Sequence, residues 1–194
     1  DIKKILNCGA SKISINSYAL KKPDFINHAA NIFGSSVISV SIDVGKIDND
    51  YYVFAVNGRE CFGKDPVDWA KEIEERGAGE ILLTCIQSEG SGEGYNIELV
   101  KKVSDAVNIR VIPNGGAGCL EHILELFKRT NVDAASLSSM LHYSLLYKYK
   151  NFNAYEEEGS KAFLEKKDYK FKNFKDFFID DIKKNLKKLN IDIR

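Results

Sequence analysis

The stretch GAGEILLTCIQSEGSGEGY, residues 77–95, decides the fold. It contains a compact apolar run over residues 81–86, bounded by glycines, which is typical of a strand buried on both faces of a parallel α/β sheet. Glu89 follows the run among Gly90, Gly92 and Gly94, which let the backbone approach a ligand closely. Because α/β proteins place their chemistry at the carboxyl ends of strands, we expect a functional site here.

The rest of the chain repeats this pattern of strand, loop and helix. We expect strands over residues 12–16, 36–44, 80–86, 109–113 and 134–138, and helices over residues 23–33, 66–76, 96–106 and 120–129. A β-hairpin is expected after Asp43, with residues 51–56 and 59–62 joined by Asn57-Gly58. About five βα units predict a parallel sheet, whereas a closed eight-unit barrel typically needs about 250 residues.

The C-terminal part differs in composition. Residues 143–175 mix Tyr and Phe with Lys and Glu, which predicts an insertion laid over the surface of a single domain that spans residues 1–194. Phe178, Ile182, Leu186 and Leu189 recur at helical spacing and predict a C-terminal helix over residues 176–190. Lysines interleaved with aromatics also occur in single-strand nucleic-acid binders, but the compensating acids favour packing.

Charge and cysteine use exclude several classes of protein. Lys plus Arg equals Asp plus Glu, 28 each, so no basic field favours nucleic acid. No apolar run has the length of a membrane span, and the four cysteines lack metal-ligand spacing. We therefore expect a cytoplasmic protein with reduced thiols, no metal site, no cofactor and no membrane or nucleic-acid partner.

Two carboxylates follow predicted strands and form the first candidate site. Asp43 and Glu89 would converge at one mouth of a barrel as a general acid/base pair, with Thr84 pointing inward from the strand before Glu89. The alternatives are that Asp43 caps a turn, that Glu89 is a solvated loop residue, and that Thr84 bonds a neighbouring strand.

Three short polar segments form the second candidate site, for anions. Residues 114–118 (NGGAG) precede a helix, so that free backbone N–H groups and the helix N-terminus point to one place. Ser138-Ser139 and Asn16-Ser17 follow two other predicted strands. A glycine-rich turn alone is a weak signal, but anion sites on both sides of two carboxylates predict a long substrate with a phosphate at each end.

Several of these stretches, in order and spacing, resemble one known family, the cyclase subunit of imidazole glycerol phosphate synthase, a (β/α)₈ barrel. The segments that carry the resemblance are GASKISINSYALKKP (9–23), SIDVGKIDNDYYVFAVNGRECFG (41–63), DWAKEIEERGAGEILLTCI (68–86) and NGGAGCLEHILELF (114–127). The resemblance implies a partial barrel with the equivalents of strands 4–8. It also implies that about 90 residues, at roughly 30 per unit, precede this sequence.

The resemblance also implies a function and assigns residues to it. In the family, ammonia from a glutaminase subunit, which forms a heterodimer with the cyclase, reacts with a bis-phosphorylated ribulosyl carboxamide ribonucleotide. The products are imidazole glycerol phosphate and an aminoimidazole carboxamide ribotide, in histidine biosynthesis. The implied catalytic residues are Glu89, Asp43 and Thr84. The implied phosphate contacts are Asn16, Ser17, Gly90, Gly115, Gly116, Ser138 and Ser139, and the implied members of a charged ammonia gate are Lys12 and Glu80.

One departure from the family pattern keeps alternatives open. Where the family has Ile-Asp-Arg-Asp-Gly-Thr, residues 86–91 are IQSEGS, so Glu89 stands in place of the catalytic aspartate. This loop and the long C-terminal segment resemble paralogues that work with an amidotransferase on bacterial surface sugars. A third hypothesis is a non-catalytic partial barrel, and for Lys12 and Glu80 the simpler interpretation is an ordinary ion pair.

Overall fold

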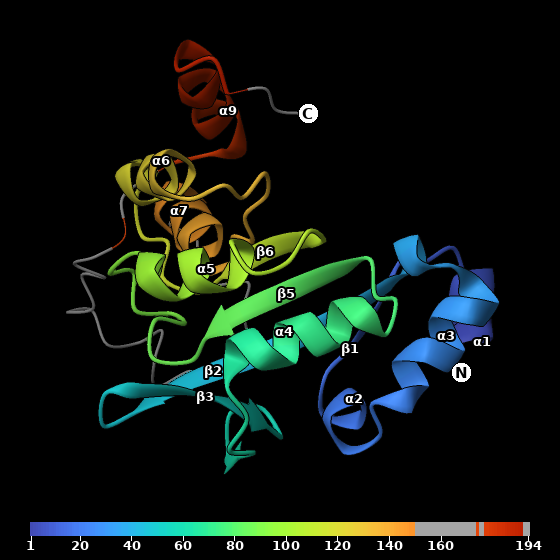
Figure 1. Ribbon diagram of the computed structural model, residues 1–194. Coiled ribbons are helices and arrows are strands. Elements are labelled where there is room, and N and C mark those ends of the chain that lie inside the picture. The colour runs from blue at the N-terminus through green and yellow to red at the C-terminus, as the bar shows by residue number, and fades with distance from the viewer. Residues whose placement is uncertain (150–173, 175–176, 192–194) are drawn as a thin grey trace, which may run out of the picture.

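A curved sheet organises the protein in a computed structural model, which describes residues 1–149, 174 and 177–191 (Figure 1). Four parallel strands lie side by side in chain order: β1 (Ile13–Ile15), β2 (Ile38–Ile47), β5 (Glu80–Cys85) and β6 (Arg110–Asn114). The end of β2 also pairs antiparallel with β3 (Asp50–Ala55), which pairs with β4 (Glu60–Cys61). The predicted α/β class with a parallel sheet is confirmed, and the described strands form an open sheet rather than a closed barrel.

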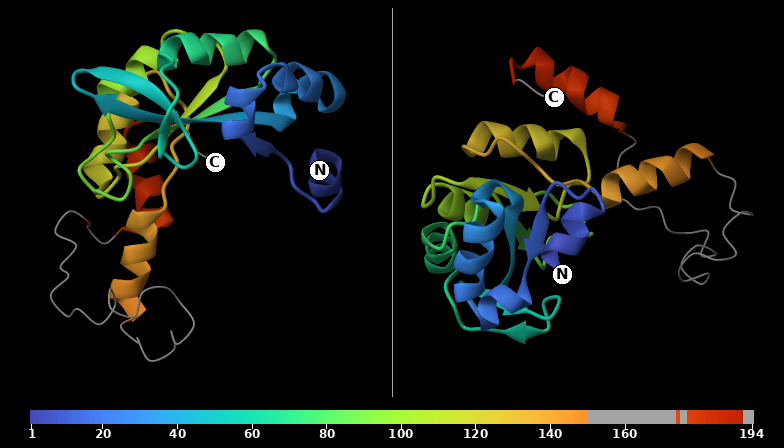
Figure 2. Two further views of the ribbon diagram at one scale, coloured as in Figure 1. Left: turned by 90° about the horizontal axis from the view of Figure 1, so that it is seen from below. Right: turned by 90° about the vertical axis from the view of Figure 1, so that its right-hand side faces the viewer.

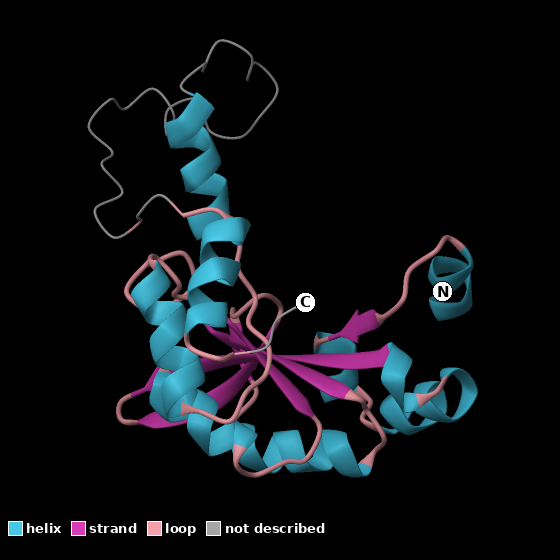
Figure 3. Cartoon of the chain, turned by 90° about the horizontal axis from the view of Figure 1, so that it is seen from above, coloured by secondary structure: helices cyan, strands magenta, loops and turns pink. Residues whose placement is uncertain are grey.

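Helices run along the outer side of this sheet, as Figure 3 shows. Helix α3 (Asp24–Phe33) packs on β2, α4 (Pro66–Glu75) packs on β2 and on α5 (Ile97–Ser104), and α5 packs on β6 and α6. The remaining helices are α1 (Ile2–Asn7), α2 (Ser17–Lys21), α6 (Leu120–Arg129), α7 (Ser139–Tyr149) and α9 (Ile179–Lys188), with a short 3₁₀ turn at Ser35–Val37. None of the helices in the described part of the chain is long and apolar enough to span a membrane.

The alternation of side chains along the strands separates a core from a polar face. Ile42 and Val44 of β2, and Ile81 and Leu83 of β5, are fully or almost fully buried against the helix layer. Trp69 of α4 is also fully buried in this core. Because successive residues of a strand point to opposite sides, the intervening positions face the inner side of the curved sheet. That inner side carries the polar residues at the strand ends.

Local sequence signals explain where α4 begins. The Asp65 side chain accepts hydrogen bonds from the backbone N–H groups of Val67 and Asp68, and Pro66 occupies the first helical position. A side-chain cap of this kind is worth about 1 kcal/mol of helix stability. The helix ends before Gly77, whose φ of 92° suits a residue without a side chain. Strand β5 begins three residues after Gly77.

Most predicted elements are confirmed, and one is wrong. The hairpin after Asp43 exists as β3 and β4, although β2 runs on to Ile47 and itself pairs with β3. Residues 134–138 do not form the predicted fifth strand. Only one backbone hydrogen bond joins them to β6, from Ser136 N–H to the Pro113 carbonyl at 2.9 Å, among the bonds of the described residues. Small side chains such as Ala134 and Ala135 offer little packing to hold a longer edge ladder.

Helix α9, in the C-terminal part of the chain, lies beside α6 and α7 (Figures 1 and 2). Ile182 and Leu186 of α9 are buried, and the Phe177 N–H donates a 3.2 Å hydrogen bond to Ser144 Oγ of α7. Of the predicted surface insertion over residues 143–175, the first seven residues belong to α7, and residues 150–173 and 175 lie outside the described part. The division into one domain with an insertion and a final helix stays a prediction.

Candidate active site

Four polar side chains form a row across the carboxyl ends of the strands. Asp43 of β2 is in register with Thr84 of β5, and Thr84 is in register with Asn114 of β6. The Asn114 amide donates a 3.1 Å hydrogen bond to Thr84 Oγ1, and the Asn16 amide, at the end of β1, donates a 2.8 Å bond to Asp43. Two predicted catalytic residues, Asp43 and Thr84, are thus neighbours in one polar row.

Asn114 is a side chain that the sequence reasoning did not single out. Its glycine-rich turn was expected to present backbone groups, whereas its side chain fixes the Thr84 hydroxyl. The only sequence signal was its position directly after an apolar strand. The number of residues that separates Asn114 from Thr84 in the chain gives no hint of their contact.

Glu89 lies beyond this row, on the loop after β5. Its side chain is exposed, and across residues 1–149, 174 and 177–191 no hydrogen bond or ion pair engages its carboxylate. Its backbone N–H donates a 3.0 Å bond to the Cys85 carbonyl, which closes a turn directly after the strand. The structure therefore places Asp43 and Glu89 at the same end of the sheet without bringing them into contact.

The glycine-rich turn after β6 holds the Glu89 loop tightly. Gly115 has a φ of 90°, and a side chain there would begin 3.2 Å from Glu89 Cα. Gly116 has a φ of 109°, its carbonyl accepts a 2.7 Å hydrogen bond from the Gly94 N–H, and a Cβ on it would lie only 2.0 Å from the Gly94 carbonyl oxygen. Glycine is therefore required at both positions, because the neighbouring backbone leaves little room for a side chain and because φ is positive.

Two predicted phosphate-binding groups lie on neighbouring segments. The bond between Ser136 and Pro113 fixes the segment before α7 beside the end of β6, and Tyr95 Oη donates a 3.0 Å bond to the Ser136 carbonyl. Burial of the Tyr95 hydroxyl raises its pKa, so it stays a neutral donor. Gly115 follows Pro113 by two residues, and Ser138, followed by Ser139, comes two residues after Ser136. The two predicted phosphate-binding segments, Gly115-Gly116 and Ser138-Ser139, therefore both begin close to the hydrogen bond between Ser136 and Pro113.

The other predicted phosphate group, Asn16 and Ser17, makes two different contacts. Asn16 bonds Asp43 as described, and its Oδ1 atom is buried without a hydrogen-bond partner among the described residues. Ser17 Oγ accepts a 2.9 Å hydrogen bond from the Val56 N–H in the tip of the hairpin. Gly90, also predicted as a phosphate contact, is exposed, and a Cβ built on it would have no atom within 4 Å.

Charged residues gather at the opposite, amino-terminal end of the strands. Lys12 and Glu80, predicted as members of a gate, form an ion pair across β2, with Glu80 buried and Lys12 partly exposed. Arg110 is in register with Glu80 and pairs with Asp133 at 2.9 Å. The hydrogen bonds that Arg110 donates to the Asp133 carboxylate, with a smaller contribution from the charge of Glu80, raise the pKa of Arg110 above its ordinary value. The sequence reasoning did not identify Arg110.

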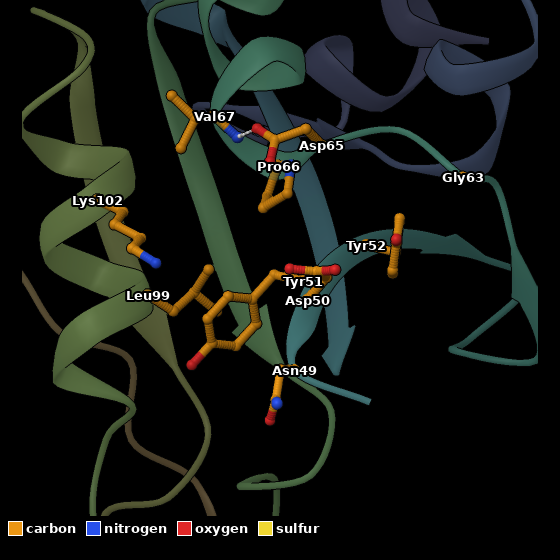
Figure 4. A pocket seen from close by; sticks show the side chains of 10 residues that line it. All are labelled: Asn49, Asp50, Tyr51, Tyr52, Gly63, Asp65, Pro66, Val67, Leu99 and Lys102. Atoms are coloured by element: carbon orange, nitrogen blue, oxygen red, sulfur yellow. Dashed lines mark hydrogen bonds between the residues drawn. The ribbon is translucent and has the colours of Figure 1, made fainter. Parts of the chain in front are cut away.

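A separate pocket of about 270 Å³ opens between β3, the segment before α4, and α5 (Figure 4). Tyr51 lies in it with its hydroxyl bonded to Asn96, which also caps α5, and the ammonium of Lys102 lies 5.6 Å from the centre of the Tyr51 ring. None of the four residues of the polar row lines this pocket. It is a surface hollow outside the candidate active site.

Metal-ligand residues are dispersed. In the described ranges no three His, Cys, Asp or Glu residues are grouped closely enough to hold a metal ion. All four cysteines are free thiols, two of them buried. His122, on α6, accepts a 3.2 Å hydrogen bond from the Gly118 N–H and so supports the glycine-rich turn.

Comparison with known proteins identifies the family to which the chain is similar. Residues 1–146 match the family model described as "Histidine biosynthesis protein". The chain is 45% identical over 162 residues to the protein named imidazole glycerol phosphate synthase subunit HisF of Clostridium botulinum (strain Okra / Type B1). The aligned residues make up 82% of this chain and 64% of that protein. It is 47% identical over 144 residues to the protein of the same name from Hydrogenobaculum sp. (strain Y04AAS1), covering 74% of this chain and 57% of that protein. The chain thus spans about three fifths of the length of these curated relatives.

Proposed function

The chain belongs to the histidine biosynthesis protein family, and from that premise we propose that its polar row is part of the active site of a cyclase of the imidazole glycerol phosphate synthase type. The observation that carries the proposal is the row of Asn16, Asp43, Thr84 and Asn114 at the carboxyl ends of the strands, which consists of two hydrogen-bonded pairs with Asp43 and Thr84 in register between them. Barrel enzymes place their catalytic residues at this end. The relatives whose name specifies this synthase support the proposed reaction.

In this proposal Asp43 and Glu89 provide acid/base catalysis. Asp43 is partly buried and held by Asn16, so its carboxylate has a defined position. Glu89 stands where the family has aspartate, and its backbone is wedged against Gly115. Gly115 thus limits movement of the loop on that side, and the torsions of the longer side chain would have to accommodate the extra methylene. A displacement of about 1 Å at a catalytic group can cost about 10²-fold in rate.

Phosphates at the two ends of the substrate would bind on either side of the row. Asn16 and Ser17 lie at the β1 end, and the backbone of Gly115 and Gly116 with Ser138 and Ser139 lies at the β6 end. Backbone N–H groups and hydroxyls are good donors to phosphate oxygens. The separation of the two groups across β2 and β5 suits the long bis-phosphorylated ribulosyl carboxamide ribonucleotide.

Ammonia would reach this row from the other end of the strands. The Lys12–Glu80 pair stands at that entrance, and side chains of the sheet's inner face lead from it to Asp43 and Thr84. A glutamine amidotransferase partner docked there would supply the ammonia, and such a pair would act in the cytoplasm, in keeping with the free thiols. With ammonia the ribulosyl compound would be split and cyclised to imidazole glycerol phosphate and an aminoimidazole carboxamide ribotide, a lyase reaction.

Steady-state turnover of the ribulosyl substrate by the full-length protein, with ammonium salt as nitrogen source, tests the proposal. We expect formation of both products, and loss of turnover in Asp43→Asn with the fold intact. A folded protein that binds its amidotransferase yet gives no turnover would contradict the proposed reaction. It would favour amidation of a different, sugar-type acceptor.

A further inference from the structure

The tip of the hairpin is strained at a residue that usually avoids its conformation. Residues 56–59 connect β3 to β4, and Val56 has a φ of 53°, followed by Asn57 at 55° and Gly58 at 76°. Asn and Gly tolerate positive φ, but for a β-branched residue such as valine it is a genuine outlier that costs about 1–3 kcal/mol. Strain of this size persists only where other contacts hold the backbone in place.

Burial of the valine side chain does not hold it, because Val56 is 36% exposed. The contacts that do hold the tip reach to two other strand ends. The Val56 N–H donates a 2.9 Å hydrogen bond to Ser17 Oγ after β1, and Gly58 lies so close to Ile86 after β5 that a side chain would begin 3.1 Å from Ile86 Cδ1. The hairpin tip therefore lies over the end of β2 and is attached on both sides of it.

The bond to Ser17 determines what its hydroxyl can do. A hydroxyl carries one hydrogen to donate and oxygen lone pairs to accept. Because the Val56 N–H occupies the oxygen as an acceptor, the hydroxyl hydrogen is left to donate to another group. An anion can accept only from a donor, so this arrangement prepares Ser17 for a phosphate oxygen. The residue next to it, Asn16, is tied to Asp43, which places the prepared hydroxyl beside the catalytic row.

We propose that Val56 is a positioning residue: through its backbone N–H it fixes Ser17 as a hydrogen-bond donor to the substrate phosphate at the β1 end of the site. The proposal rests on the proposed function for the existence of a phosphorylated substrate. It adds the backbone N–H of Val56 to the groups that shape the phosphate site and gives the strained backbone at Val56 a physical reason.

A single-atom change tests this in the full-length protein. Incorporation of the α-hydroxy acid analogue of valine at position 56 replaces the N–H by an ester oxygen and keeps the side chain. We expect the KM for the ribulosyl substrate and the Kd for inorganic phosphate to rise about 5- to 10-fold, the value of one hydrogen bond. The kcat should stay within about two-fold, because Ser17 would bind a phosphate group and not a bond that forms or breaks in the reaction.

Two further variants separate positioning from hairpin stability. Ser17→Ala should give a similar loss, and the ester at 56 should add nothing to it, because both changes break the same bond. The matched control is the ester at Arg59, whose N–H closes the same tip by donating to the carbonyls of Ala55 at 3.1 Å and Val56 at 3.3 Å, and which makes no bond to Ser17. This control should leave the KM and the phosphate Kd close to those of the parent protein.

Three results would overturn the proposal: an unchanged KM and phosphate Kd in the ester at 56, an equal loss in the ester at 59, or full additivity of Ser17→Ala with the ester. The phosphate titration does not depend on turnover. An unmodified protein that binds phosphate but does not convert the ribulosyl substrate would contradict the proposed function alone, and the titration of the variants would still decide the role of Val56.

Discussion

The Asn16 side-chain amide donates a 2.8 Å hydrogen bond to the Asp43 carboxylate and so joins the end of β1 to the end of β2. The second polar atom of the same side chain, Asn16 Oδ1, is buried without a hydrogen-bond partner among the described residues. An unsatisfied buried acceptor costs about 1–3 kcal/mol. A donor on a bound substrate or ammonia would satisfy this atom next to the proposed catalytic carboxylate.

The first prediction concerns Asp43 and Asn16. We expect Asp43→Asn to lower ammonia-dependent kcat about 10²- to 10⁴-fold, the usual contribution of general acid/base catalysis. Asn16→Ala should cost about 10-fold, because Asp43 keeps its charge but loses the bond that orients it. Steady-state kinetics with ammonium salt measures both, with circular dichroism as the control for folding. Asp43→Asn with nearly full activity would remove Asp43 from the mechanism.

The second prediction concerns the Lys12–Glu80 pair. Lys12→Met should lower the free energy of unfolding by about 1–3 kcal/mol, because the Glu80 side chain is only 8% exposed and would lose its counter-charge. Lys102→Met is the matched control. Lys102 and its partner Glu98 are 54% and 61% exposed, so water and salt screen that pair and breaking it should change the free energy of unfolding far less.

Urea unfolding of the two variants and of the double variant Lys12→Met, Glu80→Gln gives the comparison. The double variant should recover part of the loss, since the uncompensated charge is gone. Equal stabilities of Lys12→Met and Lys102→Met would show that the buried carboxylate does not depend on Lys12.

The third prediction separates close approach from backbone strain in the glycine-rich turn. Gly116 and Gly90 both have positive φ, 109° and 70°, so alanine is strained at either position. Only at Gly116 would the new Cβ meet backbone, 2.0 Å from the Gly94 carbonyl oxygen, whereas nothing lies within 4 Å at Gly90. We expect Gly116→Ala to be less stable than Gly90→Ala by about 1–3 kcal/mol, measured by urea unfolding. Equal losses would mean that the two loops are not pressed together.

The fourth prediction concerns pH and Glu72 on α4. Burial acts to raise the pKa of Glu72, but hydrogen bonds from Lys64 at 2.6 Å and Arg76 at 2.9 Å outweigh it and lower the pKa below its ordinary value of 4.5. A carboxyl group whose pKa is lower in the folded than in the unfolded state stabilises the protein at pH values above its ordinary, unfolded-state pKa. This stabilisation is lost as the pH falls through the lowered pKa.

Glu72→Gln should therefore flatten the acid side of the stability profile below about pH 5, with its largest destabilisation near neutral pH. Glu75→Gln, at an exposed position on the same helix, is the control for the loss of one carboxylate. Free energies of unfolding of the parent protein and the two variants, measured from pH 3 to pH 7, test this prediction. A parallel shift of the whole Glu72→Gln profile would contradict the linkage.

The sequence predicted much of the framework because its signals are local. The apolar runs before Asp43 and Glu89 gave β2 and β5, and Leu120–Arg129 forms a helix at the expected bounds. The segment over residues 134–138 failed because a strand of small residues depends on a partner edge rather than on its own composition. The catalytic and phosphate roles of the site residues stay predictions.

By itself the sequence determined the order of strands and helices and which residues stand at strand ends, because periodicity, glycines and caps act over a few neighbouring positions. Only the tertiary structure decided which of those residues meet. Asn16 with Asp43, Asn114 with Thr84, and Ser17 with Val56 are separated by 27, 30 and 39 positions in the chain. Their contacts depend on strand register and on the path of the hairpin tip, which are set when the sheet and its helices pack together.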